Sequence, residues 1–181
     1  PSSTDWDFGS GDFTIECWVK GTMTTDSGII NRSNGGATDG NSAWILYWYN
    51  SSSKARLWFG LTENTGWDAS VEGTTQINDG HWHHIAVTRE GNNLKAWTDG
   101  ILEGTTAFSG TIPTSTRVLE IASHDTGSYL DAEISNVRVV KGTAVYTSSF
   151  RPPTEPLTNI TNTKLLCCNN SSTTGATVSP G

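Results

Sequence analysis

Basic residues are scarce in this chain. Among 181 residues, 11 Lys and Arg stand against 18 Asp and Glu, which gives a formal net charge of −7. Nucleic-acid binding depends on a basic surface that releases counterions from phosphates. The acidic balance therefore argues against a nucleic-acid partner, and charge spread along a chain mainly favours solubility.

Long apolar runs are also missing. The longest run, Ala43 to Tyr49, is far shorter than the roughly 20 residues that a helix needs to cross a bilayer. The first residues, PSSTDWDFGSG, lack the charged and apolar regions of a signal peptide. We therefore expect no insertion into a membrane.

Leucine and methionine, on which helices depend, number only ten and one. No apolar stripe at helical spacing has a useful length. By contrast there are 27 Thr and 20 Ser, and threonine, like valine, isoleucine and the aromatic residues, suits a pleated surface. The length fits one domain with a single core, so the composition predicts an all-β domain.

Short apolar runs separated by Gly, Asn, Asp and Ser clusters predict the strands, at spacings typical of a sandwich or barrel. Two turns are well marked, Gly91-Asn92-Asn93 and Asp99-Gly100, because these residue types tolerate a positive φ. The expected strands are 13–22, 28–33, 43–50, 54–63, 66–73, 81–90, 93–106, 118–123, 130–141 and 163–169.

Alternation along these strands predicts which side chains face the core, since neighbours point to opposite sides. The opposite faces are polar and carry single tryptophans, as at Trp18, Trp58 and Trp97. The expected inward residues of three strands are Phe13, Ile15, Cys17 and Val19; Ala55, Leu57, Phe59 and Leu61; and Leu94, Ala96 and Thr98.

The chain changes character from Arg151. The segment RPPTEPLTNITNT holds three of the six prolines and predicts an extended strap over the surface, because proline cannot donate to a strand ladder. KLLCC then predicts a last strand. Residues 170–181 have almost nothing to bury, so we expect a sandwich over 1–169 followed by a flexible linker or tail.

Three stretches resemble laminin-G-like, concanavalin A-type lectin domains: DFTIECWVK, HWHHIAVTREGNNLKAWTDGILEGT and YLDAEISNVRVVKGTAVYTSSFRPPTEPLT. The third is especially similar to versions in tail and other structural proteins of marine bacteriophages. The resemblance covers about residues 5–168 and implies a jelly-roll sandwich of two antiparallel sheets. A further strand usually precedes the position of Pro1 in such domains, so we expect the first strand to be missing and the chain to be part of a longer modular protein.

Catalysis is not expected. Many glycanases of this fold carry Glu-x-Asp-x-Glu or Glu-x-Asp-x-x-Glu, which places nucleophile and acid on one strand face. The nearest match here is Asp131-Ala132-Glu133, with Tyr129 in place of the partnering Glu. His81, His83 and His84 match a structural motif of the family, and His83 and His84 point to opposite faces of one strand, so they cannot hold one ion together.

Calcium is the metal that the resemblance implies, because related lectin domains often hold it at the rim and hard cations prefer carboxylate and carbonyl oxygens. Asp125 and Asp131 lie near that place in the sequence. Many relatives have Asp-Glu where this chain has Ser135-Asn136, which removes two charges.

Carbohydrate sites combine flat aromatic faces with a few polar groups. Trp18 and Trp97 match family positions, so we expect them to pack under loops. The candidate ligand-binding site is a shallow one, formed by outer-face aromatics with the loops 34–42, 64–70 and 124–129. The run WILYWYN is apolar on both faces, which indicates a strand covered on both sides or a patch made for a partner. The candidate ligand-binding residues are Tyr47, Tyr49, Trp58, Trp67, Asp39 and Asn41.

The three cysteines form no closed disulfide framework. A bridge from Cys17 to Cys167 or Cys168 requires the first and last strands to be neighbours, with Cα atoms within about 7 Å. Buried free thiols are the simpler expectation.

The resulting hypothesis is a non-catalytic lectin-like module on the surface of a phage particle, in a tail fibre or similar appendage, that adheres to host-surface glycan as a homo-oligomer. The alternative is a structural decorating or oligomerisation domain of the virion that binds no sugar. A third interpretation, an extracellular adhesin of a cell, depends only on the source.

Overall fold

The computed structural model describes residues 3–33, 41–51, 54–61, 68–124, 128–170 and 177–178. Its elements are η1 (Thr4–Trp6), β1 (Phe13–Lys20), β2 (Ser27–Asn31), β3 (Trp44–Ser51), β4 (Lys54–Leu61), β5 (Ala69–Glu72), β6 (His83–Glu90), β7 (Asn93–Thr98), β8 (Ile101–Ala107), β9 (Glu120–Ile121), β10 (Ser123–His124), β11 (Ser128–Tyr129), β12 (Glu133–Lys141), β13 (Thr163–Cys167) and β14 (Thr177–Val178). No helix in these ranges is long and apolar enough to cross a membrane.

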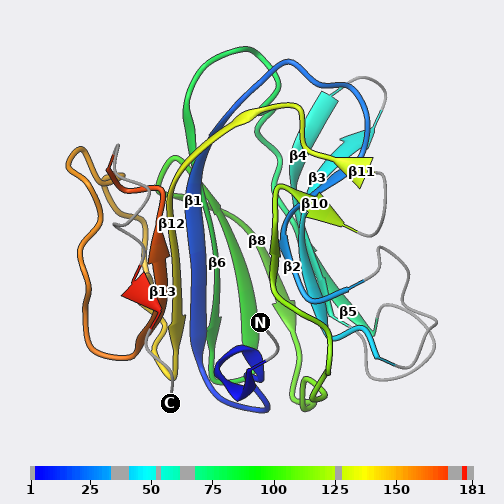
Figure 1. Ribbon diagram of the computed structural model, residues 1–181, viewed down its shortest axis with the longest axis vertical. Helices are drawn as coiled ribbons and strands as arrows, with labels where there is room; N and C mark the ends of the chain where they lie inside the picture. Colours follow the sequence, from blue (N-terminus) through cyan, green and yellow to red (C-terminus); the bar gives the residue numbers. More distant parts are fainter. Residues whose placement is uncertain are drawn as a thin grey trace.

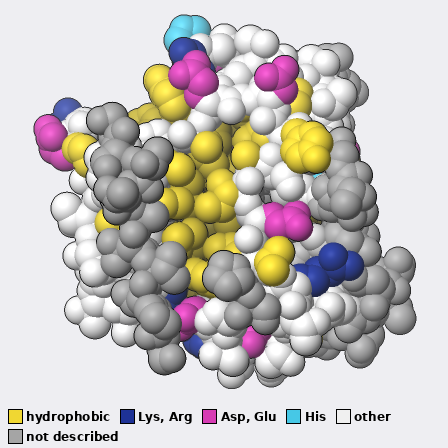
Figure 2. Space-filling view, viewed as in Figure 1, with side chains coloured by type: hydrophobic (Ala, Val, Ile, Leu, Met, Phe, Trp, Pro, Cys, Tyr) yellow, Lys and Arg dark blue, Asp and Glu magenta, His cyan; other side chains and the backbone are white. Residues whose placement is uncertain are grey.

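Twelve of the strands form two facing antiparallel sheets, as the all-β jelly-roll prediction requires, and β10 and β11 form a separate two-stranded sheet. One sheet has seven strands in the order β14-β13-β12-β1-β6-β7-β8, and the other has five in the order β5-β4-β3-β2-β9. Figure 1 looks along the edge of the sandwich, with β1 and β12 in one layer and β2 and β3 in the other. Figure 2 shows hydrophobic side chains gathered between the layers on this face.

The inward faces follow the predicted alternation. Phe13, Ile15, Cys17 and Val19 of β1 are fully buried and belong to the core. Trp44, Leu46 and Trp48 of β3 meet them from the opposite sheet. Burial of apolar area between the sheets stabilises the fold by about 25 cal/mol per Å². Because every second side chain of a strand faces the core, the two-residue period of apolar residues determines which face of each sheet is buried.

Several predicted boundaries differ from the observed ones. The predicted turn at Asp99-Gly100 is confirmed, and its positive φ values of 51° and 79° divide the expected strand 93–106 into β7 and β8. The range 118–123 is interrupted at Ala122, with φ 59°, between β9 and β10. A positive φ breaks strand pairing locally. The residue types at Asp99-Gly100 predict such a break, whereas nothing in the apolar pattern predicts the one at Ala122.

The loop between β12 and β13, residues 142–162, is the strap. It covers the outer face of the seven-stranded sheet and begins before the predicted Arg151 (Figure 1). Its path is fixed by hydrogen bonds to one strand after another: Val145 N to Thr14 Oγ1 on β1, Thr88 Oγ1 on β6 to Tyr146 O, and Phe150 N to Gly100 O at the β7–β8 turn. The strap therefore buries polar residues of this face, among them Glu16, His84 and Thr88.

The expected linker after residue 169 is wrong for Thr177–Val178. These two residues pair with Leu166 and Leu165 as β14. The physical reason is that β13 would otherwise present an unpaired edge, and Thr and Val both favour strands.

A bridge between Cys17 and the last strand is excluded by the strand order. β12 lies between β1 and β13, and two strand spacings amount to about 9.5 Å, beyond the reach of a disulfide. All three cysteines are free, with Cys17 buried, and burial raises the pKa of its thiol well above the ordinary value.

Candidate functional site

The strap is held by a buried carboxylate, Glu16 of β1. Its Oε2 accepts a hydrogen bond from the Tyr146 hydroxyl at 2.7 Å and lies 3.0 Å from His84 Nε2. Its Oε1 accepts from Arg138 Nε at 2.8 Å, and Arg138 Nη1 donates to the strap carbonyl of Thr158 at 3.2 Å. Burial by itself raises the pKa of Glu16, but the hydrogen bond with His84 and the charge of Arg138 outweigh burial and lower it. The carboxylate therefore stays ionised and ties the strap to the sheet.

An aromatic stack fills the space beside this network. The Tyr146 and Phe150 rings are parallel at 3.6 Å, and Phe150 lies 5.8 Å from Trp97. Trp97 is fully buried on the outer side of β7 and donates from Nε1 to Thr88 Oγ1 at 3.0 Å. The prediction that Trp97 packs under a loop is confirmed.

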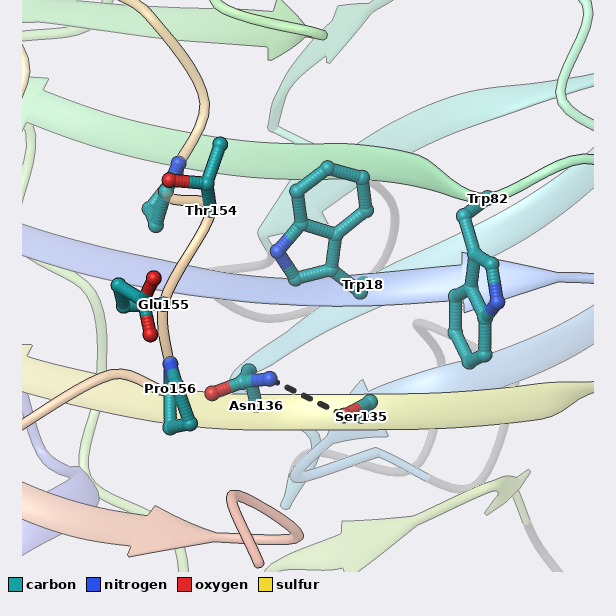
Figure 3. Close-up of a pocket in the computed structure, with 8 residues that line it drawn as sticks. Trp18, Trp82, Ser135, Asn136, Thr154, Glu155 and Pro156 are labelled. Carbon is teal, nitrogen blue, oxygen red and sulfur yellow. Dashed lines mark hydrogen bonds between the residues drawn. The ribbon is translucent and has the colours of Figure 1, made fainter.

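Trp18 behaves differently from Trp97, and here the prediction is wrong. It is only half-buried, because the returning part of the strap passes beside it and leaves a hollow of about 470 Å³. Trp82, just before β6, stands next to Trp18 and is 41% exposed. We call this space the aromatic hollow; it is lined by Trp18, Trp82, Ser135, Asn136, Pro153, Thr154, Glu155 and Pro156 (Figure 3).

The floor of the aromatic hollow is shaped by a β-bulge at Asn136. The register between β1 and β12 shifts between Glu16 and Trp18, and Asn136 takes φ 53°, which asparagine tolerates better than most residues. Its Oδ1 accepts from Leu157 N at 2.7 Å and its Nδ2 donates to Ser135 Oγ at 3.1 Å. One side chain thus fixes both the strap wall and the neighbouring hydroxyl.

The hollow combines two kinds of surface. Figure 3 shows the Trp18 indole between the strap residues and Trp82, with Asn136 and Ser135 on the β12 side. Two aromatic faces beside a carboxylate, an amide and hydroxyls suit a ligand with an apolar face and polar edges. The site is lined by β1, β12, the segment just before β6 and the strap.

The predicted aromatics lie on the other sheet. Tyr47 and Tyr49 of β3 and Trp58 of β4 share its outer face, because Tyr47 is paired with Trp58 and Tyr49 with Arg56. Trp58 lies 6.3 Å from Tyr47, edge to face, and 6.4 Å from Tyr49. The structure therefore brings these three predicted residues together, and we call them the aromatic face. Burial raises the pKa of Tyr47 to about 12.

The other predicted ligand-binding residues are not in this group. Trp67 and Asp39 lie outside the described residues. Asn41 holds a neighbouring loop, since its Nδ2 donates to Thr116 Oγ1 and its Oδ1 accepts from Thr116 N, both at 2.9 Å. These contacts give Asn41 a structural role.

Of the two predicted calcium ligands, Asp131 is exposed near the end of β1, and Asp125 lies outside the described residues. The described ranges contain no group of three or more His, Cys, Asp or Glu side chains that could hold a metal. Calcium binding by Asp125 and Asp131 therefore stays a prediction. A melting temperature measured with calcium and with chelator tests this metal directly, because an ion bound only by the native state raises it.

The histidines have the structural roles expected of them. His83 and His84 point to opposite sides of β6. His83 Nδ1 lies 2.7 Å from Asp99 Oδ2 and its Nε2 lies 3.1 Å from Asp79 Oδ1 at the rim. Burial lowers the pKa of His83, but the hydrogen bonds with Asp99 and Asp79 outweigh it, and the net pKa is raised.

Sequence reasoning missed Trp82 and Glu155. A signal for Trp82 existed, because it shares its parity with His84 and so with the outer face that carries Trp18. No such signal existed for Glu155, because it belongs to the hollow only through the path of the strap.

A family model described as the concanavalin A-like lectin/glucanases superfamily matches residues 2–145. No sequence among the curated proteins matches the chain. Similar solved structures include a Bacteroides ovatus protein named for expected carbohydrate binding, with TM-score 0.61 and 14% identity over 88% of this chain and 46% of that one. The chain thus spans less than half of that protein.

Two further structures have the same fold. Domain 4 of the extracellular arabinanase AbnA from Geobacillus stearothermophilus, solved with arabinotriose, has TM-score 0.58 and 16% identity over 80% of this chain and 67% of that one. A botulinum neurotoxin type C structure, whose cell entry depends on two ganglioside molecules, has TM-score 0.53 and 19% identity over 74% of this chain and 33% of that one. At these identities the likeness shows the fold alone.

Proposed function

Because the chain belongs to the concanavalin A-like lectin/glucanases superfamily, we propose that it is a carbohydrate-binding module with its sugar site in the aromatic hollow. The observation that carries this proposal is the pair of indoles, Trp18 and Trp82, in one hollow with Glu155, Asn136 and Ser135. The arabinotriose complex of one similar domain supports the ligand class.

Binding without catalysis fits the carboxylates of the site. Glycoside hydrolysis requires two carboxyl groups facing each other across the scissile bond. Glu155 is the acidic residue of the aromatic hollow, and Glu133, from the near-match to the glycanase motif, is paired with Lys20 at 2.8 Å. We therefore assign no acid–base pair to this site.

The biological setting that we propose is adhesion to host-surface glycan by an appendage of a phage particle. It is supported by the resemblance of residues 129–158 to phage structural proteins. One open site of this kind binds weakly, and many copies on a particle or in a homo-oligomer raise the effective concentration and hence the avidity.

A structural role in the virion is the second candidate. It is favoured by Ile101 and Leu102, which are 57% and 40% exposed at the start of the edge strand β8. An exposed apolar pair on an edge strand is a typical contact for another subunit.

A glycan array with the purified chain in its native oligomer separates the two candidates. We expect binding that Trp82→Ala weakens about 30-fold, since truncating an aromatic anchor costs about 2 kcal/mol. Tyr129→Ala is the matched control, because Tyr129 is 72% exposed on β11 and lies outside the hollow. Absence of binding to every glycan would contradict the proposal and favour the structural role.

A further inference from the structure

A second hollow of about 540 Å³ lies at the end of β1. Its lining is charged rather than aromatic, and we call it the charged hollow. Both hollows fall in the range of roughly 300–1,000 Å³ that is typical of small-molecule sites. The charged hollow is lined by Lys20, Gly21, Thr22, Gly80, Leu130, Asp131, Ala132 and Glu133.

The two hollows are consecutive on one surface. Trp18 is paired with Ser135 in the aromatic hollow, and Lys20 is paired with Glu133 in the charged one. Residues two apart on a strand share a face and are separated by about 6.8 Å. Lys20 Nζ lies 5.9 Å from the centre of the Trp82 ring, so these two side chains meet where one hollow passes into the other.

The floor of the charged hollow is main chain held in a fixed position. Gly80, with φ 82°, donates from its N–H to Gly21 O at 3.1 Å. A Cβ on Gly21 would come within 2.8 Å of the Ala132 Cβ, so glycine is required for this close approach. This hydrogen bond and this close approach fix the main chain that lines the charged hollow.

The charges of the combined surface are unequal. Three carboxylates line it, from Glu155, Asp131 and Glu133, against one ammonium, from Lys20. That ammonium is already engaged by Glu133 at 2.8 Å. The field in the groove therefore opposes an anionic ligand, and like-charge juxtaposition is an effective device of specificity.

We propose, on the basis of the function proposed above, that the two hollows form one groove that binds at least two consecutive units of a neutral or amino-sugar glycan chain and rejects acidic chains. One unit lies against the indoles and the next lies over Lys20 and Glu133. The groove is open, so it accepts an internal stretch of a chain as well as an end.

Calorimetric titration with ladders of one to four units tests the chain length, with cello-, xylo- and chito-oligosaccharides as neutral or N-acetylated probes. We expect affinity for at least one ladder to rise tenfold or more with chain length. Thr22→Trp places a bulky side chain in the charged hollow from an exposed position. In this variant we expect affinity no longer to rise with oligosaccharide length, while the affinity for the shortest ligand that binds is unchanged.

Thr161→Trp is the matched control, because Thr161 is also exposed and lies near the opposite end of β12. It keeps the wild-type dependence on length. Equal affinity for all lengths, or a gain that survives Thr22→Trp, would overturn the two-unit groove and leave the proposed function intact. Absence of binding to these ladders and to every glycan on the array would overturn both.

Oligogalacturonides of matched length test the charge. At low salt we expect them to bind at least tenfold more weakly than the best neutral chain, and 0.5 M NaCl narrows the gap by screening. Equal or tighter binding of the acidic chain would overturn the charge selection.

Discussion

The outer face of the seven-stranded sheet is covered by the strap, whereas the outer face of the five-stranded sheet carries its aromatic side chains half-buried. Both faces alternate polar residues with single aromatics. On the covered face, however, Glu16, His84 and Trp97 have no exposed surface, while on the other Tyr47, Tyr49 and Trp58 keep part of theirs. A loop far along the sequence thus decides whether an outward side chain becomes part of a second core, the wall of a site or an open surface.

Glu16→Gln, on the covered face, is expected to cause the largest loss of stability. It leaves the Arg138 guanidinium buried without its counter-charge, which costs about 3–5 kcal/mol for a buried pair. The equivalent change on the five-stranded sheet, Glu72→Gln, removes a pair with Arg56 whose partners are 37% and 29% exposed, so it costs at most about 1 kcal/mol. Urea unfolding measures both, and equal costs would contradict the role given to the strap network.

Gly100→Ala tests the docking of the strap at the β7–β8 turn. Gly100 has φ 79°, and a Cβ there would lie 1.9 Å from Phe150 O, so the strap must move. We expect a loss of about 3 kcal/mol from backbone strain together with displaced contacts. Gly91→Ala has a similar φ of 57° and nothing within 4 Å, so it carries only the strain of about 1 kcal/mol. Thermal unfolding should therefore show a larger loss of stability for Gly100→Ala than for Gly91→Ala. Equal losses would contradict the docking of the strap at Gly100.

Acid should loosen the covered face first. The pKa of Glu16 is lowered in the fold, so its contribution to stability is fully present above the ordinary value of 4.5 and is lost as the pH falls through the folded pKa. Other carboxylates with lowered pKa values, such as Glu103, titrate in the same window. The melting temperature of the wild type should therefore fall more steeply below pH 4.5 than that of Glu16→Gln. Parallel curves would show that Glu16 does not drive the loss.

Tyr146→Phe is expected to have a smaller effect than Glu16→Gln. It removes a hydroxyl that donates to the Glu16 carboxylate at 2.7 Å, a hydrogen bond to a charged group worth about 1.5–3 kcal/mol. Tyr47→Phe on the aromatic face removes a hydroxyl 3.5 Å from His124 Nε2, a contact too long to contribute more than about 0.5 kcal/mol. Denaturant midpoints measure the stability lost by each variant. A larger loss for Tyr47→Phe than for Tyr146→Phe would contradict the difference between the two faces.

The layers could be predicted from the sequence because burial between two sheets depends on a two-residue period. Phe13 to Val19 and Leu94 to Ala96 follow this rule, and the Asp99-Gly100 turn follows from the φ values that its residues tolerate. The prolines likewise predicted a strap after Arg151. These features are local, so one stretch of sequence contains them.

The aromatic hollow could not be predicted in the same way. Trp18 and Trp97 both lie on outward positions of the same sheet, yet Trp97 is sealed by Phe150 and Trp18 faces open space. The difference depends on where the strap turns back, which is set by contacts such as Asn136 with Leu157, 21 residues away in sequence. The pairing of Tyr47 with Trp58, by contrast, followed from two adjacent strands, and whether these residues contact a ligand stays a prediction.

Amide hydrogen exchange with and without a saturating oligosaccharide tests the central claim most directly. That claim is that sugar binds in the hollow formed by β1, β12 and the strap rather than on the aromatic face. It predicts slower exchange at residues 133–136 and at Thr154, Glu155 and Leu157, with β3 and β4 unchanged. Protection confined to β3 and β4, with no change in the strap, would contradict it.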